Sequence, residues 1–323
     1  MSAPLLQVDG VSVEFPVRRG LLRREVARLR AVNDVSVAVA AGEVLGIVGE
    51  SGCGKTTLGR AMVGLHAPAS GTLRVEGRDV AALSADERRR LTRDVQMVFQ
   101  DPFASLNPRK RIRQILEVPF EVHGLARGDE REARIRELAS LVGLLPEHLD
   151  RWPHELSGGQ RQRVGIARAL ALQPKVVVLD EPLSALDMSI QSQVLNLLVD
   201  LQARLGLSYV FISHDLSIVE YLCDSVAVMY LGRIVESAPA DALFAAPRHP
   251  YTQALLAAVP DPVPRRERAT RRLEGDVPSL LEAPAGCAFH TRCPVAEPRC
   301  RESVPELRAI DTTGLHRAAC HLL

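Results

Sequence analysis

Two short runs of consecutive apolar residues lie at 44–48 and 176–179. Neither run alternates apolar with polar positions, as a strand with one solvent-facing side would. Each run therefore predicts a parallel strand that is buried on both faces. A glycine-rich turn follows the first run directly, and two acidic residues follow the second.

Apolar residues recur at helical spacing in two longer stretches, 129–144 and 184–206. Both stretches predict amphipathic helices whose apolar side packs in the core, and Gly206 is a typical residue just beyond a helix end. The core-facing residues expected in them are Ile135, Leu138, Val142, Ile190, Val194, Leu197, Leu198, Leu201 and Leu205. Buried strands alternating with such helices indicate an α/β fold.

The composition is that of a globular protein. The chain has 323 residues, 46% of them apolar, and a formal net charge of +1. This balance argues against a nucleic-acid-binding protein, which normally shows a strongly basic face. No apolar run has the length that a membrane-spanning helix needs, and the first residues lack the pattern of a secretory signal. We therefore expect a cytosolic protein with reduced cysteines.

The turn after the first strand has the sequence G-E-S-G-C-G-K-T, residues 49–56. Its glycines allow backbone N–H groups to point at phosphate oxygens, and a helix beginning near Lys55 adds its N-terminal dipole. Lys55 can reach the β and γ phosphates, and Thr56 can offer its hydroxyl to Mg²⁺. The thiol of Cys53 is a possible site of oxidation. The residues expected to surround the phosphates are Gly49, Glu50, Ser51, Gly52, Cys53, Gly54, Lys55, Thr56 and Thr57.

Asp180 and Glu181 end the second buried strand. We expect Asp180 to hold Mg²⁺ and Glu181 to be the general base that activates water. Together with the phosphate loop, they predict a phosphate-hydrolysing site that works by positioning and charge stabilisation.

The stretch between Lys55 and Asp180 contains the string L-S-G-G-Q, residues 156–160. Ser157 is expected to cap a helix whose N-terminus is a second anion-binding point. Two such points in one chain suggest that two subunits face each other and share the nucleotides. Residues from about 101 to 171 are expected to form a separate helical subdomain.

These motifs, in this order, resemble the ATP-binding-cassette (ABC) ATPases over residues 5 to about 240. The resemblance implies a P-loop ABC ATPase core over residues 1–245, with ATP and Mg²⁺ as cofactors. It implies that Gln100 touches Mg²⁺ and water, that His214 contacts the γ phosphate, and that Asp187 lies at the dimer seam. The residues that it places over the nucleotide of the opposite subunit are Ser157, Gly158, Gly159 and Gln160.

One family feature is displaced in this chain. Family members stack an aromatic ring on the adenine just before the phosphate loop, and Phe15 is the only residue available. Stacking and an ordinary place in a strand core remain open for Phe15. The insert at 18–30, with six arginines, is expected to be a solvated loop or short helix, with lipid headgroup contact as the alternative.

Residues 246–323 resemble the C-terminal extension of ATPase subunits of dipeptide and oligopeptide importers, on the strings H-P-Y-T-Q-A-L-L and G-C-A-F-H-T-R-C-P. The resemblance implies a paralogous ATPase partner in a heterodimer, two integral membrane permease subunits, an extracytoplasmic binding protein, and a place on the cytoplasmic face of the cell membrane. Nickel chelates and glutathione are alternative cargoes, and a soluble non-transport ABC ATPase is an alternative class. The Pro- and Arg-rich stretch 260–272 predicts a linker.

Four of the six cysteines lie in this extension, which predicts a small cysteine-rich domain. Their gaps are wider than the two to four residues typical between paired zinc ligands. A 4Fe–4S cluster, a zinc ion with help from a nearby histidine, and thiols that only pack the domain all remain open. The resemblance favours the cluster, because some importers of this type hold one here. The cysteines are Cys287, Cys293, Cys300 and Cys320, and the histidines are His290, His316 and His321.

Overall fold

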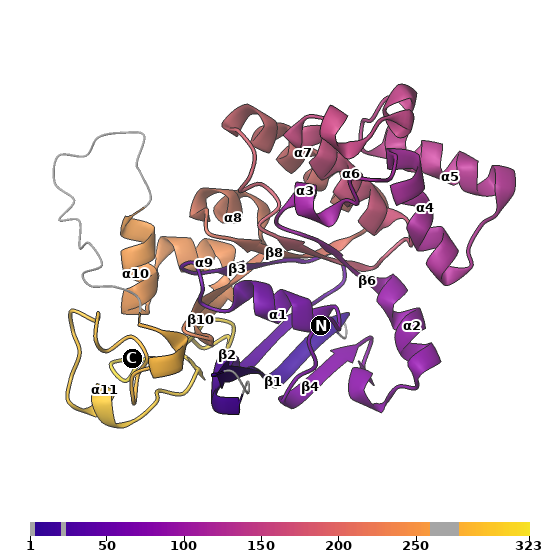
Figure 1. Ribbon diagram of the computed structural model, residues 1–323. Coiled ribbons are helices and arrows are strands. Elements are labelled where there is room, and N and C mark those ends of the chain that lie inside the picture. Colours follow the sequence, from indigo (N-terminus) through magenta and orange to yellow (C-terminus); the bar gives the residue numbers. More distant parts are fainter. Residues whose placement is uncertain (1–3, 21–23, 259–277) are drawn as a thin grey trace.

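The computed structural model describes residues 4–20, 24–258 and 278–323. The linker expected at 260–272 lies outside these described residues. Within them, two sheets enclose helix α1 (Lys55–Met62), and further helices cover the other face of the larger sheet (Figure 1). None of the helices that the structure describes has both the length and the apolar character needed to cross a bilayer.

The larger sheet has the strand order β11-β12-β10-β9-β3-β8-β7-β6. Its central part is parallel, because β3 pairs with both β8 and β9, and β7 pairs with β6 and β8. Every residue of β3 and β7 is buried, which confirms the two strands predicted from apolar runs. The strands are β3 (Val44–Val48), β6 (Val95–Val98), β7 (Val176–Asp180), β8 (Ser208–Ser213), β9 (Ser225–Tyr230), β10 (Arg233–Pro239), β11 (Arg308–Ala309) and β12 (Arg317–Ala318).

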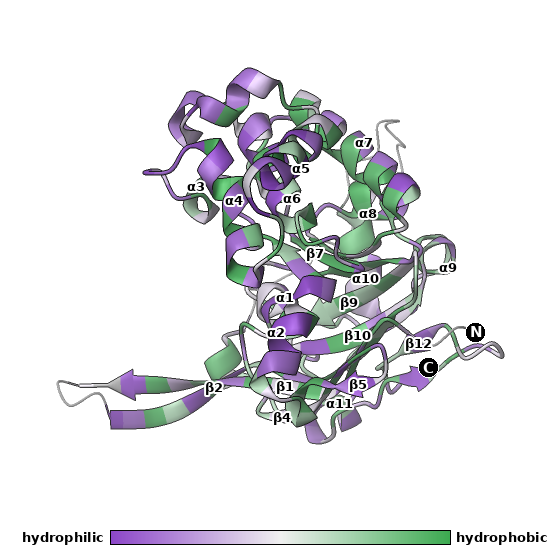
Figure 2. Cartoon of the chain, turned by 90° about the vertical axis from the view of Figure 1, so that its right-hand side faces the viewer, coloured by the Kyte–Doolittle hydropathy of each residue, from purple (hydrophilic) through white to green (hydrophobic). Residues whose placement is uncertain are grey.

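The smaller sheet is antiparallel, with the order β2-β1-β4-β5. Figure 2 shows that β1 and β2 extend beyond the body as a two-stranded arm. The expectation of a loop or short helix at 18–30 is therefore wrong, since the described residues there, apart from Gly20 in the turn, belong to the two strands. The strands are β1 (Leu6–Arg19), β2 (Arg24–Val39), β4 (Ser70–Val75) and β5 (Arg78–Asp79).

Opposite charges across the two strands explain why an arginine-rich segment forms this arm. Glu14 lies opposite Arg30 and accepts a hydrogen bond from its Nε at 2.9 Å. The same carboxylate is within 3.7 Å of Arg28. Such cross-strand pairs stabilise a ladder whose side chains remain in solvent.

The helices α3–α6 lie together at one end of the molecule, beyond β6 (Figure 1). The two amphipathic helices predicted from spacing are confirmed as α5 and α7, and Gly206 caps α7 in the left-handed conformation. Leu205 is an exception to the predicted buried stripe, since it is 47% exposed. The remaining helices are α2 (Ala85–Asp94), α3 (Pro102–Ser105), α4 (Ile112–His123), α5 (Gly128–Leu141), α6 (Gly158–Leu170), α7 (Met188–Leu205), α8 (Leu216–Leu222), α9 (Ala240–Ala245), α10 (Pro250–Ala257) and α11 (Arg299–Glu302).

The C-terminal residues join the main sheet. Strand β12 pairs with β10, and β11 pairs with β12. Phe289 is 1% exposed and belongs to the same hydrophobic core as β9 and α10. The expected separate cysteine-rich domain is therefore not confirmed, because this segment continues the sheet and the core of the nucleotide-binding part.

Candidate functional site

The phosphate loop joins β3 to α1. Gly54 takes a left-handed conformation (φ 109°) directly before the helix, and no side chain caps the first turn of α1. The first N–H groups of the helix are therefore available to an anion. Gly49 packs against the carbonyl of Met229, where any Cβ would overlap that oxygen. These two glycines give the loop its shape.

Lys55 is 4% exposed, and its ammonium group is held inside the loop. Its Nζ donates to the carbonyl oxygens of Gly49 at 2.8 Å and Glu50 at 3.0 Å. A lysine held by carbonyls of a loop rich in N–H donors suits a ligand that brings negative oxygens to the same place.

Asp180 lies at the C-terminal end of β7, beside the start of α1. Thr56 Oγ1 donates to Asp180 Oδ1 at 2.9 Å. Burial raises the pKa of the Asp180 carboxyl above its ordinary value, and Thr56 opposes this. A buried carboxylate next to a hydroxyl is the donor set that Mg²⁺ prefers. The two residues thus fit the Mg²⁺ of a bound nucleotide.

Glu181 follows Asp180 and has a left-handed backbone conformation (φ 44°). Its Oε2 accepts a hydrogen bond from Gln100 Nε2 at 2.9 Å. The same oxygen lies 3.5 Å from His214 Nδ1. A small pocket of about 70 Å³ beside Glu181 and His214 has room for water. The structure therefore brings together three residues predicted from separate stretches of sequence.

Cys53 is 1% exposed, and burial raises the pKa of its thiol. A buried thiol with a raised pKa is a poor nucleophile. The suggestion that Cys53 makes the protein sensitive to oxidation is therefore not supported by its surroundings.

The string 156–160 begins helix α6, away from the phosphate loop of the same chain. Ser157 is its N-cap, as predicted, and Ser157 and Gln160 bond reciprocally in a capping box. Asp187 caps α7 by accepting from the Ile190 N–H at 3.1 Å, and this contact lowers the pKa of Asp187. Phe15 lies on β1 and packs edge-on against His66, with ring centroids 5.1 Å apart.

The four C-terminal cysteines approach one another without forming disulfides. The pKa of the Cys287 thiol is raised mainly by burial. The nearby thiols of Cys300, Cys293 and Cys320 raise this pKa further. In three cases the N–H two residues later contacts the sulfur and opposes the shift: Phe289 on Cys287, Val295 on Cys293 and Leu322 on Cys320.

The nearby histidines are turned to other partners. His290 Nδ1 contacts the Cys287 carbonyl oxygen, His316 Nε2 contacts Glu236 Oε1, and His321 Nε2 contacts the Ser303 carbonyl oxygen. Among the residues that the structure describes, no three His, Cys, Asp or Glu side chains converge closely enough to ligate a single metal ion. No finding supports the 4Fe–4S cluster beyond the proximity of the thiols.

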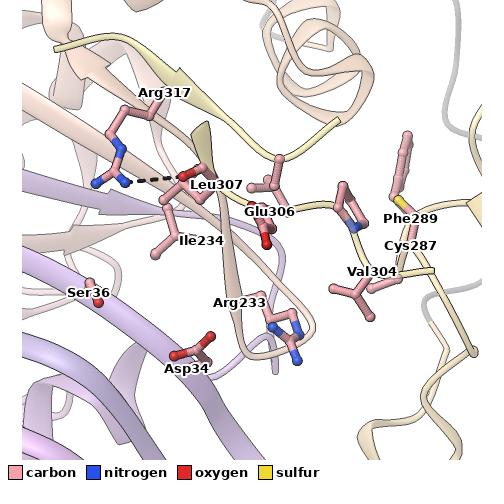
Figure 3. Close-up of a pocket in the computed structure, with 14 residues that line it drawn as sticks. Asp34, Ser36, Arg233, Ile234, Cys287, Phe289, Val304, Glu306, Leu307 and Arg317 are labelled. Carbon is pink, nitrogen blue, oxygen red and sulfur yellow. Dashed lines mark hydrogen bonds between the residues drawn. The ribbon is translucent and has the colours of Figure 1, made fainter. Parts of the chain in front are cut away.

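A pocket of about 560 Å³ lies between β2, β10 and parts of this segment. Figure 3 shows Asp34 and Arg233 lining it from β2 and β10, and Cys287 and Phe289 lining it from the C-terminal segment. Cys287 is one of the residues that line the pocket, and no residue of the phosphate loop lines it.

Sequence reasoning missed two residues that contact the phosphate loop. Arg292 forms a bidentate pair with Glu50, and the Tyr251 hydroxyl accepts a hydrogen bond from the Glu50 N–H at 2.9 Å. They are separated from Glu50 by 242 and 201 positions, so spacing carries no signal for either contact.

Three features together define an ABC-type ATPase. They are the phosphate loop, the acidic pair Asp180–Glu181 at the end of β7, and helix α6, which begins with the L-S-G-G-Q string and is called the signature helix below. Family models described as "ABC transporter" and "Oligopeptide/dipeptide transporter, C-terminal region" match residues 32–184 and 235–300.

Full-length relatives narrow the class. The oligopeptide transport ATP-binding protein AppF of Bacillus subtilis (strain 168) is 50% identical over 323 residues, covering 98% of this chain and 97% of the relative. The di/tripeptide transport ATP-binding protein DppF of Pseudomonas aeruginosa (strain UCBPP-PA14) is 51% identical, covering 98% and 97%. The chain belongs to the family of ATP-binding proteins of oligopeptide/dipeptide ABC transporters.

Two solved structures share the fold of the nucleotide-binding part. CbiO1 of Clostridium perfringens, part of the ABC transporter complex cbiONQ, is 29% identical with a TM-score of 0.63, over 76% of this chain and 92% of that one. The ATP-binding cassette MJ0796, a dimer bound to ADP and Pi, is 27% identical with a TM-score of 0.64, over 73% and 98%.

Proposed function

We propose that this chain is the ATP-hydrolysing subunit that powers import of di- and oligopeptides across the cytoplasmic membrane. The observation that carries the proposal is the convergence of Gln100, Glu181 and His214 at the sheet edge beside the phosphate loop. Relatives that cover nearly the whole chain and are named for peptide transport support the cargo.

Each residue has a defined part in hydrolysis. Lys55 would exchange the carbonyls of Gly49 and Glu50 for phosphate oxygens. Thr56 and Asp180 would hold Mg²⁺, which would supply positive charge against the phosphates. Glu181 accepts the proton of the attacking water, and His214 and Gln100 position it. Because the Glu181 carboxylate takes this proton during the attack, the water need not first ionise to hydroxide.

The active form is a pair of such subunits on the cytoplasmic face of the membrane. We infer that the partner is a paralogous ATPase, whose own segment equivalent to residues 156–160 closes over the nucleotide bound at Lys55. Two permease subunits and an extracytoplasmic binding protein complete the importer. The signature lies on α6, apart from the loop of its own chain, and the related cassette MJ0796 is a dimer.

Uptake in cells tests the function. Deletion of the gene should abolish uptake of a labelled dipeptide or pentapeptide, and the wild-type gene should restore it while a Glu181→Gln copy should not. If uptake of a labelled nickel chelate or glutathione depends on the gene while peptide uptake is unchanged, that compound and not a peptide is the cargo. Unchanged uptake of all three would point to a non-transport ATPase.

The C-terminal cysteines are proposed to hold a 4Fe–4S cluster through Cys287, Cys293, Cys300 and Cys320. The N–H contacts on three of the sulfurs support this donor set, since such contacts stabilise thiolates. The cluster would supply a cross-link between chain segments rather than electrons, because ATP hydrolysis transfers none.

Metal analysis of protein purified without oxygen tests the cluster. About four irons and four sulfides per chain are expected, lost in Cys293→Ser and kept in the control Cys223→Ala, which lies outside the set. Stoichiometric zinc in place of iron would contradict the cluster, and so would a chain that contains neither metal.

A further inference from the structure

Residue Glu50 of the phosphate loop is held by side chains from the far end of the chain. Arg292 Nη1 donates to Glu50 Oε2 at 2.7 Å, and Arg292 Nη2 donates to Glu50 Oε1 at 3.0 Å. The Tyr251 hydroxyl accepts from the Glu50 N–H. A bidentate guanidinium–carboxylate pair fixes the orientation of both groups as well as their separation.

The Arg292–Glu50 pair is shielded from solvent. The side chains of Arg292 and Glu50 are 5% and 24% exposed, and the guanidinium lies 6.0 Å from the ring centroid of Tyr230. Surface ion pairs contribute little, because water screens them. A buried pair differs, since removal of one partner leaves the other charge without compensation.

Three groups of Glu50 are now constrained at once. Its carboxylate is held by Arg292, its N–H by Tyr251, and its carbonyl oxygen by the ammonium of Lys55. Lys55 is the residue that must exchange this carbonyl for a phosphate. The conformation of Glu50 therefore sets where the lysine and the neighbouring N–H groups point before a nucleotide arrives.

We propose that Arg292 is a positioning residue for nucleotide binding. By holding the Glu50 carboxylate, it keeps the phosphate loop in the conformation that accepts the phosphates. Because Arg292 lies in the C-terminal segment beside Cys293, the proposal links the folding of this segment to nucleotide affinity, and such a link is reciprocal. This role does not depend on the transported cargo, so it can stand or fall independently of the proposed function.

A double-mutant cycle on the full-length protein tests the role, with the dissociation constant of MgADP as the readout. Arg292→Gln and Glu50→Gln are each expected to weaken binding by about tenfold, and the double variant to be no weaker than either single one. Arg292→Lys, which keeps the charge but loses the fork, should recover part of the affinity.

Arg299→Gln is the matched control. Arg299 lies in the same segment and pairs with Glu297 at 2.9 Å, but both side chains are about half exposed. It should leave MgADP binding within about twofold of the wild type. Unfolding midpoints without nucleotide are measured for all variants.

Two results would overturn the proposal. One is a dissociation constant for Arg292→Gln within about twofold of the wild type, with only a lower unfolding midpoint. The other is that the effects of Arg292→Gln and Glu50→Gln simply add. If Arg292→Gln does not fold, Arg292→Lys replaces it in the cycle, and additivity with Glu50→Gln then decides.

Discussion

At the scale of single residues, the Oε2 atom of Glu181 is the point where three residues of the proposed hydrolytic site meet. Gln100 donates to this oxygen, and His214 lies 3.5 Å from it. Glu181 has a positive φ of 44°, a conformation that non-glycine residues seldom adopt and that is typical of functional sites.

Replacement of this carboxylate should separate hydrolysis from binding. In the assembled transporter, Glu181→Gln is expected to lower the kcat of ATP hydrolysis by about 10²- to 10⁴-fold, because the amide cannot take the proton of water. MgADP binding should change little, since Lys55 and Asp180 remain. Steady-state phosphate release and equilibrium binding check this. Retained turnover would assign the general base to another residue.

The sequence predicts most of this site for a physical reason. Lys55 and Thr56 follow β3, while Asp180 ends β7 and Glu181 follows it, and both strands are parallel members of one sheet. Parallel strands bring their carboxyl ends to a common edge, so residues far apart in sequence meet there. Arg292 reaches the loop from a segment without such a regular element, and no periodicity could indicate it.

At the scale of elements, the signature helix α6 packs closely against α7. A Cβ at Gly159 would overlap the Ile190 Cγ2 of α7. Ile190 is β-branched and turns about χ1 only with difficulty, so it cannot move aside cheaply. Gly159 is thus needed for the approach of the two helices within one subunit, in addition to any contact across a dimer.

Gly159→Ala should therefore destabilise the isolated subunit. We expect a loss of about 1–3 kcal/mol in the free energy of unfolding from overpacking, measured by urea denaturation without nucleotide. The control is Gly165→Ala in the same helix, where a Cβ meets no atom within 4 Å. That variant should gain about 0.5 kcal/mol. Equal effects at both glycines would show that the α6–α7 contact is not the cause.

The arm formed by β1 and β2 shows where prediction from sequence failed at this scale. The density of arginine at 18–30 favoured a loop or helix, because such residues rarely pack in a core. The arm has little core to pack: it is held by ladder hydrogen bonds and by pairs such as Arg30 with Glu14. A strand stabilised by its partner strand leaves no clear apolar alternation in its own sequence.

At the scale of the whole molecule, the C-terminal segment is attached to the nucleotide-binding part through a buried polar centre. Glu236 on β10 is fully buried and accepts hydrogen bonds from the Arg248 and His249 N–H groups. Its Oε1 also contacts His316 Nε2 at 2.7 Å. Around it, Phe289 packs on Tyr230 and Tyr251 with ring centroids 5.3 and 5.4 Å apart. The segment thus shares a core with β9 and α10, and Tyr251 of that core contacts the phosphate loop at the Glu50 N–H.

His249 makes the stability of this core depend on pH. Burial lowers its pKa to about 4, and only the Ala319 carbonyl opposes this. The ordinary pKa of histidine is about 6.5, so between these values the unfolded chain binds a proton that the folded chain excludes. The contribution of His249 to stability is therefore constant above about pH 7 and falls as the pH is lowered from about 6.5 toward 4.

The variant His249→Asn isolates this contribution, because an asparagine oxygen can still accept the Tyr251 N–H that His249 Nδ1 accepts at 3.1 Å. Between about pH 7.5 and pH 5, the wild type should lose about 2 kcal/mol more of its unfolding free energy than the variant. Urea denaturation at the two pH values measures the difference. Both proteins contain Glu236 and His316, so the pH dependence due to these two residues cancels in the comparison. Parallel losses in the two proteins would mean that His249 does not titrate in this window, and that the pH dependence of the shared core comes from other groups.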